Sequence, residues 1–344
     1  MGDHWNVPAC DFDPTGKYDS RCYRTMDFVK QRVAEQCYDH IRAGKHSSEL
    51  FSDAAIDYLR NYKEDNPFYM YISFMAPHDP RTMPRKYLDM YAPDKISLPE
   101  NFMPEHPFDT GAIRIRDEML AEFPRTAEEI RGHIAAYYAM ITHLDAQTGR
   151  VMKVLEEKGE LHNTIIVFAG DNGLAVGRHG LMGKQNCYEH SVRVPLIFSG
   201  PGIPAGERRD AFVYLFDIFP TLCELIGIDI PLSVEGQGLF RAINDPEEKV
   251  RDNLYFAYCD KQRAVKDRSH KLIEYVIAGK HTMTQLFDLK NDPLELNNLA
   301  DDPASKEKLK QMRNELDSYA DQWDDKTGPF GQPFWQAYKL IMVE

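Results

Sequence analysis

The stretch of residues 163–200 constrains the fold of this chain more than any other part of the sequence. It opens with a short apolar run, residues 164–169, which is rich in β-branched residues and ends at Gly170. A continuous apolar run of this length, bounded by a turn residue, is typical of a strand buried in a parallel sheet. A second apolar run at residues 195–199 closes the stretch. The sequence therefore predicts an α/β fold with a mostly parallel sheet flanked by helices.

Two oxygen-bearing side chains, Asp171 and Asn172, directly follow the first apolar run. They are expected at the carboxyl end of the predicted strand, which is where open α/β sheets bind their ligands. Carboxylate and amide oxygens are the ligands that hard cations such as Ca²⁺ or Mg²⁺ take. We therefore predict that Asp171 and Asn172 bind a metal ion. The alternative is an ordinary turn, because Asp-Asn-Gly is a common turn sequence.

The loop between the two apolar runs combines glycines with cationic side chains. It carries Arg178, His179 and Lys184, and it is interrupted by four glycines. Cationic donors beside a metal site are suited to hold an oxyanion. We predict that Lys184 faces such an anion, with Arg178 and His179 as further contacts to the substrate. For Lys184 alone the alternative is a solvated surface lysine.

A second buried strand is predicted at residues 68–75, which form a continuous apolar and aromatic run. The run leads into Ala-Pro-His-Asp-Pro, so that His78 follows the strand at its carboxyl end. We therefore expect His78 to face the same crevice as Asp171. The alternative is a rigid turn between two prolines, with a histidine whose ring is satisfied by local hydrogen bonds.

The combination and order of these motifs resembles the sulfatase family of the alkaline phosphatase superfamily. Its members carry a strand, Ser/Ala-Gly-Asp-Asn/His-Gly, a glycine-rich loop that ends in Gly-Lys, then Tyr-Glu and Arg-Val-Pro-Leu-Ile. The matching residues here are Asp171, Asn172, Gly173, Gly183, Lys184, Tyr188, Glu189, Arg193, Val194, Pro195, Leu196 and Ile197. The Pro-His-x-Pro pattern followed by Pro84 and Tyr87, and the run at residues 286–299, match the family as well.

The resemblance implies a sulfuric ester hydrolase that acts on a sulfated sugar or an aryl sulfate. In the family a formylglycine hydrate attacks sulfur, assisted by a divalent cation, commonly Ca²⁺. By this match His78 contacts the sulfate group and is the candidate for protonating the leaving alcohol, while Lys184 contacts the sulfate oxygens. The implied partner is a small-molecule or glycan sulfate ester, and full-length relatives are often exported.

The motif that yields formylglycine is absent from these 344 residues. No Cys or Ser has Pro at the second following position together with Arg at the fourth, and the two Asp-Asp pairs lie at residues 301–302 and 324–325. We therefore expect a sulfatase chain that lacks the N-terminal segment with the nucleophile and is inactive by itself. Two alternatives stay open, a non-catalytic module that binds sulfated glycans and a phosphoester hydrolase of the same superfamily.

Helical and strand periodicities divide the rest of the chain. They predict helices at residues 24–42, from Ser47 or Ser48 to Asn61, and from a cap at Thr126 to Gly159. Residues 210–228 are predicted to form a short strand that turns into a helix. From residue 253 onward, short alternating runs indicate an antiparallel sheet, followed by a charged helix at about residues 304–323. We expect an α/β domain over residues 1–250 and an antiparallel subdomain with a helix over residues 251–344.

Composition excludes several classes of function. The formal net charge of −13 argues against a general nucleic-acid binder, because such proteins neutralise phosphates with a basic face. No apolar run approaches the ~18 residues of a membrane span, and the first residues have no signal-peptide character. The six cysteines are too sparse for a disulfide scaffold. The compartment, the oligomeric state and the identity of the sulfate ester stay open.

Overall fold

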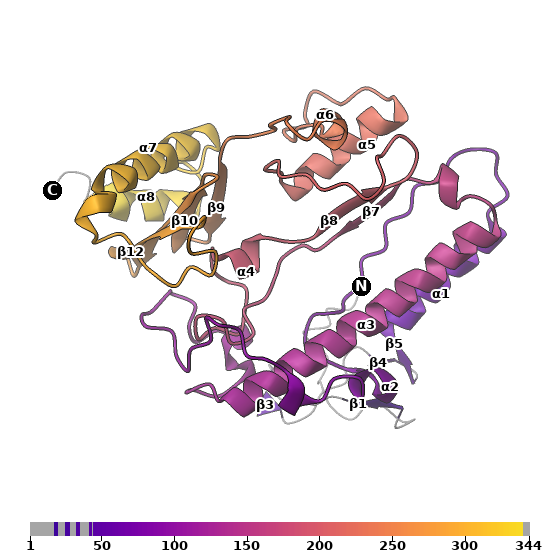
Figure 1. The fold of residues 1–344 in the computed structure, drawn as a ribbon, viewed down its shortest axis with the longest axis horizontal. Helices are drawn as coiled ribbons and strands as arrows, with labels where there is room; N and C mark the ends of the chain where they lie inside the picture. Colours follow the sequence, from indigo (N-terminus) through magenta and orange to yellow (C-terminus); the bar gives the residue numbers. More distant parts are fainter. Residues whose placement is uncertain (1–16, 20–24, 28–31, 35–40, 43, 340–344) are drawn as a thin grey trace. The chain divides into compact units, whose positions relative to one another are not determined.

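The computed structural model describes residues 17–19, 25–27, 32–34, 41–42 and 44–339. Their contacts divide the chain into two compact units, each of which is described by itself. The first unit contains the described residues of Met1–His106 together with Arg114–Thr164 and Val176–Gly183. The second unit contains Pro107–Ile113, Ile165–Ala175 and the described residues of Lys184–Glu344. Figure 1 follows the chain from indigo at its N-terminus to yellow at its C-terminus.

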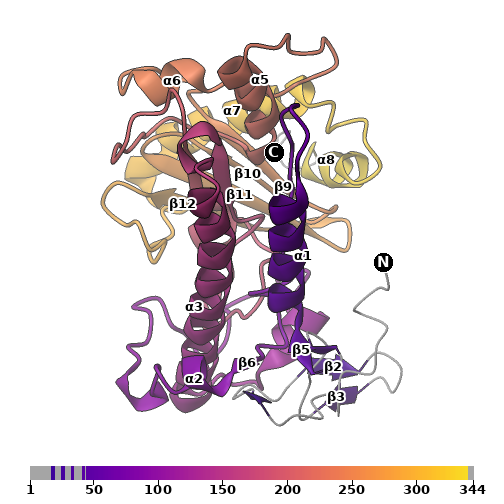
Figure 2. The same cartoon turned by 90° about the vertical axis from the view of Figure 1, so that its right-hand side faces the viewer.

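Two helices dominate the first unit, α1 (Ser47–Asn61) and α3 (Ala127–Glu157), and they lie side by side in Figure 2. Both confirm the predicted helices, and both begin at a side-chain cap. Nδ1 of His46 accepts the amide of Ser48 at 3.1 Å, and Oγ1 of Thr126 accepts the amide of Glu129 at 3.2 Å. Such caps satisfy amides that have no partner within the helix.

The remaining elements of the first unit are short. Among its described residues, three antiparallel strand pairs form, of β1 (Tyr18–Asp19) with β6 (Met83–Pro84), β2 (Thr25–Asp27) with β3 (Arg32–Ala34), and β4 (Ile41–Arg42) with β5 (Lys45–His46). The helical elements are α2 (Arg85–Leu88), η2 (Pro93–Lys95), η3 (Arg116–Leu120) and η4 (Leu161–Asn163).

The helix predicted at residues 24–42 is wrong where the structure describes this segment. Residues 25–27 and 32–34 pair as antiparallel strands, and residues 24, 28–31 and 35–40 lie outside the described part. Helical spacing of apolar residues is a weak local signal, and pairing between neighbouring segments overrides it here.

The strand predicted at residues 68–75 is also wrong as a buried, paired strand. These residues have no ladder partner among the residues that the structure describes, and Tyr69 and Tyr71 are 77% and 79% exposed. Exposure alternates along the segment, with residues 69, 71 and 73 more exposed than their neighbours. The apolar run is therefore extended, as the pattern indicates, but a strand also needs a hydrogen-bonded neighbour.

In the second unit, β7 (Ile166–Ala169) and β8 (Leu196–Ser199) correspond to the two apolar runs of the central stretch. They pair with each other antiparallel, with Ile166 opposite Ser199 and Ala169 opposite Leu196. The expected parallel, buried arrangement is thus wrong for this pair. Parallel neighbours need a crossover connection that returns the chain to the other end of the sheet, and the loop between β7 and β8 does not do so.

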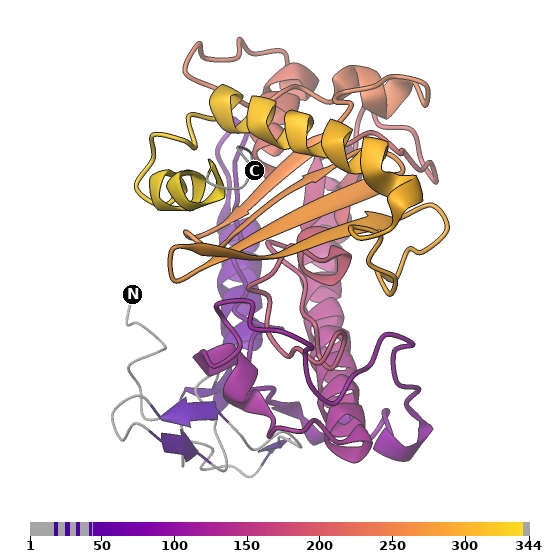
Figure 3. The same ribbon diagram turned by 90° about the vertical axis from the view of Figure 1, so that its left-hand side faces the viewer.

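The predicted C-terminal antiparallel sheet is confirmed. Its strands are β9 (Leu254–Tyr258), β10 (Gln262–Lys266), β11 (His270–Ile277) and β12 (Lys280–Asp288), in the order β12-β11-β10-β9. Figure 3 shows α7 (Lys306–Gln322), the predicted charged helix, lying across this sheet. The sheet, α7 and α8 (Gly331–Lys339) enclose a core that includes Val265, Leu272, Leu286, Leu316, Phe334 and Trp335.

Between β8 and β9 the chain forms η5 (Leu215–Asp217), α5 (Ile218–Ile226) and α6 (Phe240–Asn244). Pro220 lies in the first turn of α5, as predicted, whereas no strand forms at residues 210–214. The helix ends at Gly227, whose φ of 73° a residue without a side chain adopts at low cost. The short strand fails because no neighbouring segment pairs with it among the described residues.

Within the described part of the chain, no helix combines the length and the apolar character needed to cross a membrane. Cys187 and Cys223 are buried and Cys259 is exposed, and none of these three is in a disulfide.

Candidate functional site

Asp171 and Asn172 follow β7 directly, as predicted, and lie in the second unit. Oδ1 of Asp171 accepts the amide of Asn172 at 2.8 Å, and Nδ2 of Asn172 donates to the carbonyl oxygen of Gly173 at 2.8 Å. The two alternatives for this segment, an ordinary turn and a pair of metal ligands, are therefore compatible. The local hydrogen bonds hold the backbone, and the Asp171 side chain is exposed.

Gly173 fixes the position of this turn. Its amide donates to the carbonyl oxygen of Ser191 at 2.9 Å, and a Cβ at this position would lie 1.9 Å from the carbonyl oxygen of His190. No side chain fits in that space. The turn therefore packs directly on α4 (Glu189–Val192), and glycine is required because of the close approach of two backbones.

The donor set of Asp171 and Asn172 fits part of a hard-cation shell. Both side chains offer oxygen, the ligand atom that Ca²⁺ and Mg²⁺ prefer, and Ca²⁺ takes six to eight such ligands. Among the residues that the structure describes, no group of three or more His, Cys, Asp or Glu side chains is placed to hold a metal ion. The pair therefore supplies two ligands, and a complete shell needs others.

Lys184 lies in the same unit as Asp171 and Asn172, and its side chain is half-buried. Its amide donates to Oε1 of Gln185 at 3.0 Å.

The segment that follows Lys184 is fixed to β11 by the buried ammonium group of Lys271. Nζ of Lys271 lies 3.0 Å from the carbonyl oxygen of Cys187 and 2.7 Å from a carboxylate oxygen of Glu189.

Further side chains complete this buried network. Glu295 lies 2.7 Å from Nζ of Lys271, and its other oxygen accepts the amide of Glu189 at 2.8 Å. Burial raises the pKa of Glu189, but Lys271 and Lys266 outweigh it and lower the pKa to about 2. The Tyr188 hydroxyl donates to Oε1 of Gln285 at 2.8 Å. The Tyr-Glu motif thus serves to anchor the loop, a role that the sequence alone did not reveal.

His179 is buried and belongs to the first unit, as does Arg178. Nδ2 of Asn101 donates to Nε2 of His179 at 3.1 Å, and the His179 amide donates to the Asn101 carbonyl oxygen at 2.7 Å. Arg178 is half-buried and forms an isolated β-bridge with Phe102. The His179 ring is engaged in holding the loop, and the contacts of both residues with a substrate stay predictions.

Another histidine, His106, holds the same loop. Nδ1 of His106 donates to the carbonyl oxygen of His179 at 2.7 Å. Burial lowers the pKa of His106 to about 4, against the opposing effect of this hydrogen bond. The ring is therefore neutral at neutral pH, so that it carries no charge into a buried site.

The end of the glycine-rich loop is held by Glu118, which the sequence did not single out. Its two carboxylate oxygens accept the amides of Met182 at 2.7 Å and of Gly183 at 2.8 Å. Nη2 of Arg125 donates to the same carboxylate at 2.9 Å, and Nε of Arg125 donates to the carbonyl oxygen of Gly180 at 3.4 Å. Glu118 and Arg125 therefore hold the loop that leads to Lys184.

His78 lies in the first unit, in the turn after residues 68–75. Its Nδ1 donates to the carbonyl oxygen of Asp79 at 2.9 Å and lies 3.3 Å from the Asp79 carboxylate. The buried Asp79 is ion-paired with Arg116. Burial alone raises the pKa of Asp79, but Arg116, His78 and Arg81 outweigh it and lower the pKa to about 2.

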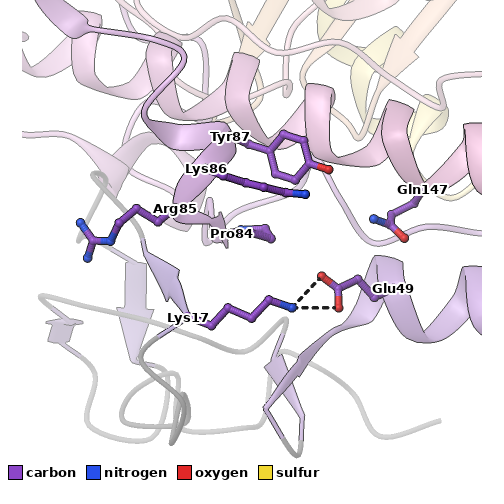
Figure 4. A pocket seen from close by; sticks show the side chains of 7 residues that line it. All are labelled: Lys17, Glu49, Pro84, Arg85, Lys86, Tyr87 and Gln147. Carbon is purple, nitrogen blue, oxygen red and sulfur yellow. Dashed lines mark hydrogen bonds and ion pairs between the residues drawn. The ribbon is translucent and has the colours of Figure 1, made fainter.

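Figure 4 shows a pocket of about 310 Å³ in the first unit. It is lined by Lys17, Glu49, Pro84, Arg85, Lys86, Tyr87 and Gln147. Nζ of Lys17 contacts the Glu49 carboxylate at 3.5 Å, and the Lys86 ammonium group lies over the Tyr87 ring. His78 does not line this pocket, although the Pro84 and Tyr87 of its motif do.

Comparison with known proteins agrees with the motifs. Residues 5–228 match the Sulfatase family, and residues 177–322 match the family N-sulphoglucosamine sulphohydrolase, C-terminal. The chain is 33% identical over 279 residues to an arylsulfatase of Clostridium perfringens, an alignment that covers 79% of this chain and 57% of the relative. It is 34% identical over 287 residues to a choline-sulfatase of Rhizobium meliloti, with 81% and 55% covered. The chain thus spans a little over half the length of these relatives.

The fold agrees with solved structures of this kind. One is a protein in complex with its substrate D-glucosamine-2-N,6-O-disulfate, which superposes with a TM-score of 0.71 at 21% identity and covers 84% of this chain and 73% of that one. The predicted α/β class of alkaline phosphatase-like fold is confirmed by this similarity. Since the family match extends over more than half of its residues, the chain belongs to the sulfatase family.

Proposed function

We propose that the protein is a sulfuric ester hydrolase that acts on a sulfated sugar or an aryl sulfate. The observation that carries the proposal is the placement of three side chains in one unit. Asp171 and Asn172 follow β7, and Lys184 lies on the loop that connects β7 to β8. Two hard oxygen ligands and one cation are among the groups that would hold a metal ion and a sulfate ester.

Different residues of the chain take different roles in the proposed reaction. Lys184 binds the sulfate oxygens and stabilises the charge that develops on them during transfer. His78 donates a proton to the leaving alcohol, while Asp79 accepts from its Nδ1 side and orients the ring. When bound, a divalent cation held by Asp171 and Asn172 would neutralise sulfate oxygens and polarise the ester. Members of the family use formylglycine as the attacking group, and no Cys or Ser here lies in the required motif.

A sulfated sugar is the preferred substrate class. One of the structural neighbours has D-glucosamine-2-N,6-O-disulfate as its substrate, and another relative is an ulvan-active sulfatase. A sulfated sugar has a poor leaving group, which must be protonated as it departs, and His78 meets this need. An aryl sulfate has a better leaving group and depends less on such a proton.

We also propose that the division near residue 250 separates two parts with different roles. The antiparallel sheet β9–β12 has its own core with α7 and α8, which supports a subdomain over residues 251–344. Through Lys271 and Glu295 this sheet fixes the segment after Lys184. In this proposal it supports the site rather than binding the metal.

The test uses what we call the extended chain, in which this chain is preceded by an N-terminal segment that carries the formylglycine motif of the family. We expect it to hydrolyse 4-nitrophenyl sulfate and a 6-O-sulfated glucosamine, and to lose activity when divalent cations are chelated. Hydrolysis of a phosphate ester in preference to both sulfates would favour a phosphoester hydrolase. Binding of the sulfated sugar without turnover would favour a non-catalytic module.

A further inference from the structure

We propose that the short helix η3 (Arg116–Leu120) sets the relative position of two loops of the site, and that Arg116 and Glu118 are its positioning residues. This inference rests on the proposed function, because the two loops carry His78 and lead to Lys184.

The first contact of η3 goes to the His78 turn. Arg116 is ion-paired with the carboxylate of Asp79, and both side chains are about nine-tenths buried. Asp79 in turn offers its carbonyl oxygen and its carboxylate to Nδ1 of His78. Arg116 is also paired with Asp117, whose Oδ1 lies 3.1 Å from Nη1. Through Asp79, Arg116 therefore fixes which way the His78 ring faces.

The second contact goes to the glycine-rich loop. Glu118 accepts one hydrogen bond from Met182 and one from Gly183, each with a separate oxygen. Its side chain is 3% exposed, and Arg125 neutralises it from the other side. Lys184 is the next residue after Gly183, so the direction in which the chain enters Lys184 is fixed by this carboxylate.

The two contacts start from almost the same point on the backbone. Residues rise by about 2 Å each along a 3₁₀-helix, so the Cα atoms of residues 116 and 118 are a few ångströms apart. The helix itself is fixed, since the amides of Glu118 and Met119 both donate to the Ile115 carbonyl oxygen and Leu120 is buried. One rigid turn thus holds two loops that have no regular secondary structure of their own.

Such an arrangement has a catalytic consequence. A group that acts on an ester must be held to within a fraction of an ångström, because misplacement by about 1 Å can cost on the order of 100-fold in rate. Charged hydrogen bonds from buried side chains supply this rigidity. A purely structural role would instead stabilise both loops without separating their effects on catalysis.

The first test measures hydrogen exchange on the chain itself. We expect Glu118→Gln to speed exchange of the Met182 and Gly183 amides by about tenfold, because one acceptor and the negative charge are lost. The matched control is Glu274→Gln, which neutralises another buried carboxylate in the second unit. Equal acceleration at Met182 and Gly183 in the control, or none in Glu118→Gln, would overturn the assignment. If Glu118→Gln does not fold, Glu118→Asp serves instead, since it keeps the charge but shortens the reach.

The second test is made in the extended chain and compares two sulfate esters that differ in their leaving group. The comparison distinguishes the effect of the His78 turn from the effect of the loop that leads to Lys184. Arg116→Met should lower kcat/KM at least tenfold more for an alkyl sulfate than for 4-nitrophenyl sulfate, because only the alkoxide needs the proton from His78. Glu118→Gln should lower kcat/KM by the same factor for both esters, since Lys184 acts on sulfate oxygens that both share.

The outcomes are distinguishable. The same leaving-group profile in both variants would show that η3 has only a general structural role, and would overturn the positioning proposal. Failure of the unmodified extended chain to hydrolyse either ester would instead refute the proposed function, and the exchange measurement would still decide whether Glu118 holds the loop.

Discussion

Nζ of Lys271 lies 2.7 Å from a carboxylate oxygen of Glu189, and both groups are withdrawn from solvent. The pair joins a residue of β11 to the first residue of α4, and it is completed by Glu295. It therefore connects the C-terminal sheet to the chain that leaves Lys184.

We predict that Lys271→Met destabilises the protein by about 3–5 kcal/mol, since it removes the cation beside the buried Glu295 and leaves Glu189 with Lys266 alone. Urea unfolding followed by circular dichroism measures the change. The control is Lys153→Met, because Lys153 is largely exposed and its pair with Glu157 spans 4.0 Å. An exposed pair of this kind contributes below about 1 kcal/mol. Equal effects of the two substitutions would show that the buried network does not hold this region.

His106 makes the stability depend on pH. Burial lowers its pKa from 6.5 to about 4, so between these values the unfolded state binds more protons than the folded state. The free energy of unfolding should therefore fall as the pH is lowered from about 6.5 to 4. His106→Gln should remove this contribution, which thermal melts across the same pH range would detect. If the stability of His106→Gln depends on pH in the same way as that of the unmodified protein, the prediction is wrong.

The sequence predicted the long helices and the C-terminal sheet well, because their signals are local. Thr126 and the periodic apolar residues after it mark α3, and alternating runs mark β9–β12. The strand at residues 68–75 and the parallel pairing of β7 failed for a different reason. Both depend on which segment lies alongside, and an apolar run contains no information about its neighbour.

The motif residues of the candidate site could be predicted from the sequence, but the buried charged residues that hold its loops could not. Asp171, Lys184 and His78 stand in sequence patterns that resemble those of a known family. Glu118 and Lys271 stand in no pattern, because a buried charge is defined by partners far along the chain. Glu118 reaches residues 64 and 65 positions away, and Lys271 reaches a carbonyl oxygen 84 positions away.

We predict that the chain of 344 residues does not hydrolyse an aryl sulfate by itself. None of its Cys or Ser residues lies in the motif for the formylglycine nucleophile, and positioning alone cannot replace an attacking group. The measurement is release of 4-nitrophenol from 4-nitrophenyl sulfate in the presence of Ca²⁺. Turnover above that of Lys184→Ala would show that another group attacks the sulfur.

Exposed apolar side chains on β7, on β8 and in the unpaired segment at residues 68–75 predict association of the chain in solution. Phe168 on β7 and Ile197 on β8 are 44% and 56% exposed, and Tyr69 and Tyr71 are more exposed still. Full burial of a side chain of this size contributes about 1.5–3 kcal/mol, so contacts between copies are favoured. Sedimentation velocity should detect oligomers, and Phe168→Thr with Ile197→Thr should reduce them. A monodisperse monomer with a sharp cooperative melt would contradict this.

Substitutions of Lys184 and Asp171 test the sulfate pocket and the metal site separately. In the extended chain, Lys184→Ala should lower kcat/KM by on the order of 100-fold or more, as expected for the loss of one donor to a developing charge. Its melting temperature should barely change, because in this proposal Lys184 acts on the sulfate oxygens and not on the packing of the loop.

Asp171→Ala should abolish activity and also the rise in melting temperature on addition of Ca²⁺, since a hard cation that loses a carboxylate ligand binds far more weakly. The stabilisation by Ca²⁺ needs no turnover, so it can be measured in the chain of 344 residues as well. Normal kinetics in Lys184→Ala beside an inactive Asp171→Ala would show that the metal ligand is correctly assigned and that the sulfate oxygens are held by another residue. If stabilisation by Ca²⁺ persists in Asp171→Ala, the carboxylate of Asp171 is not a metal ligand. The exposed Asp171 would then be only the first residue of a turn.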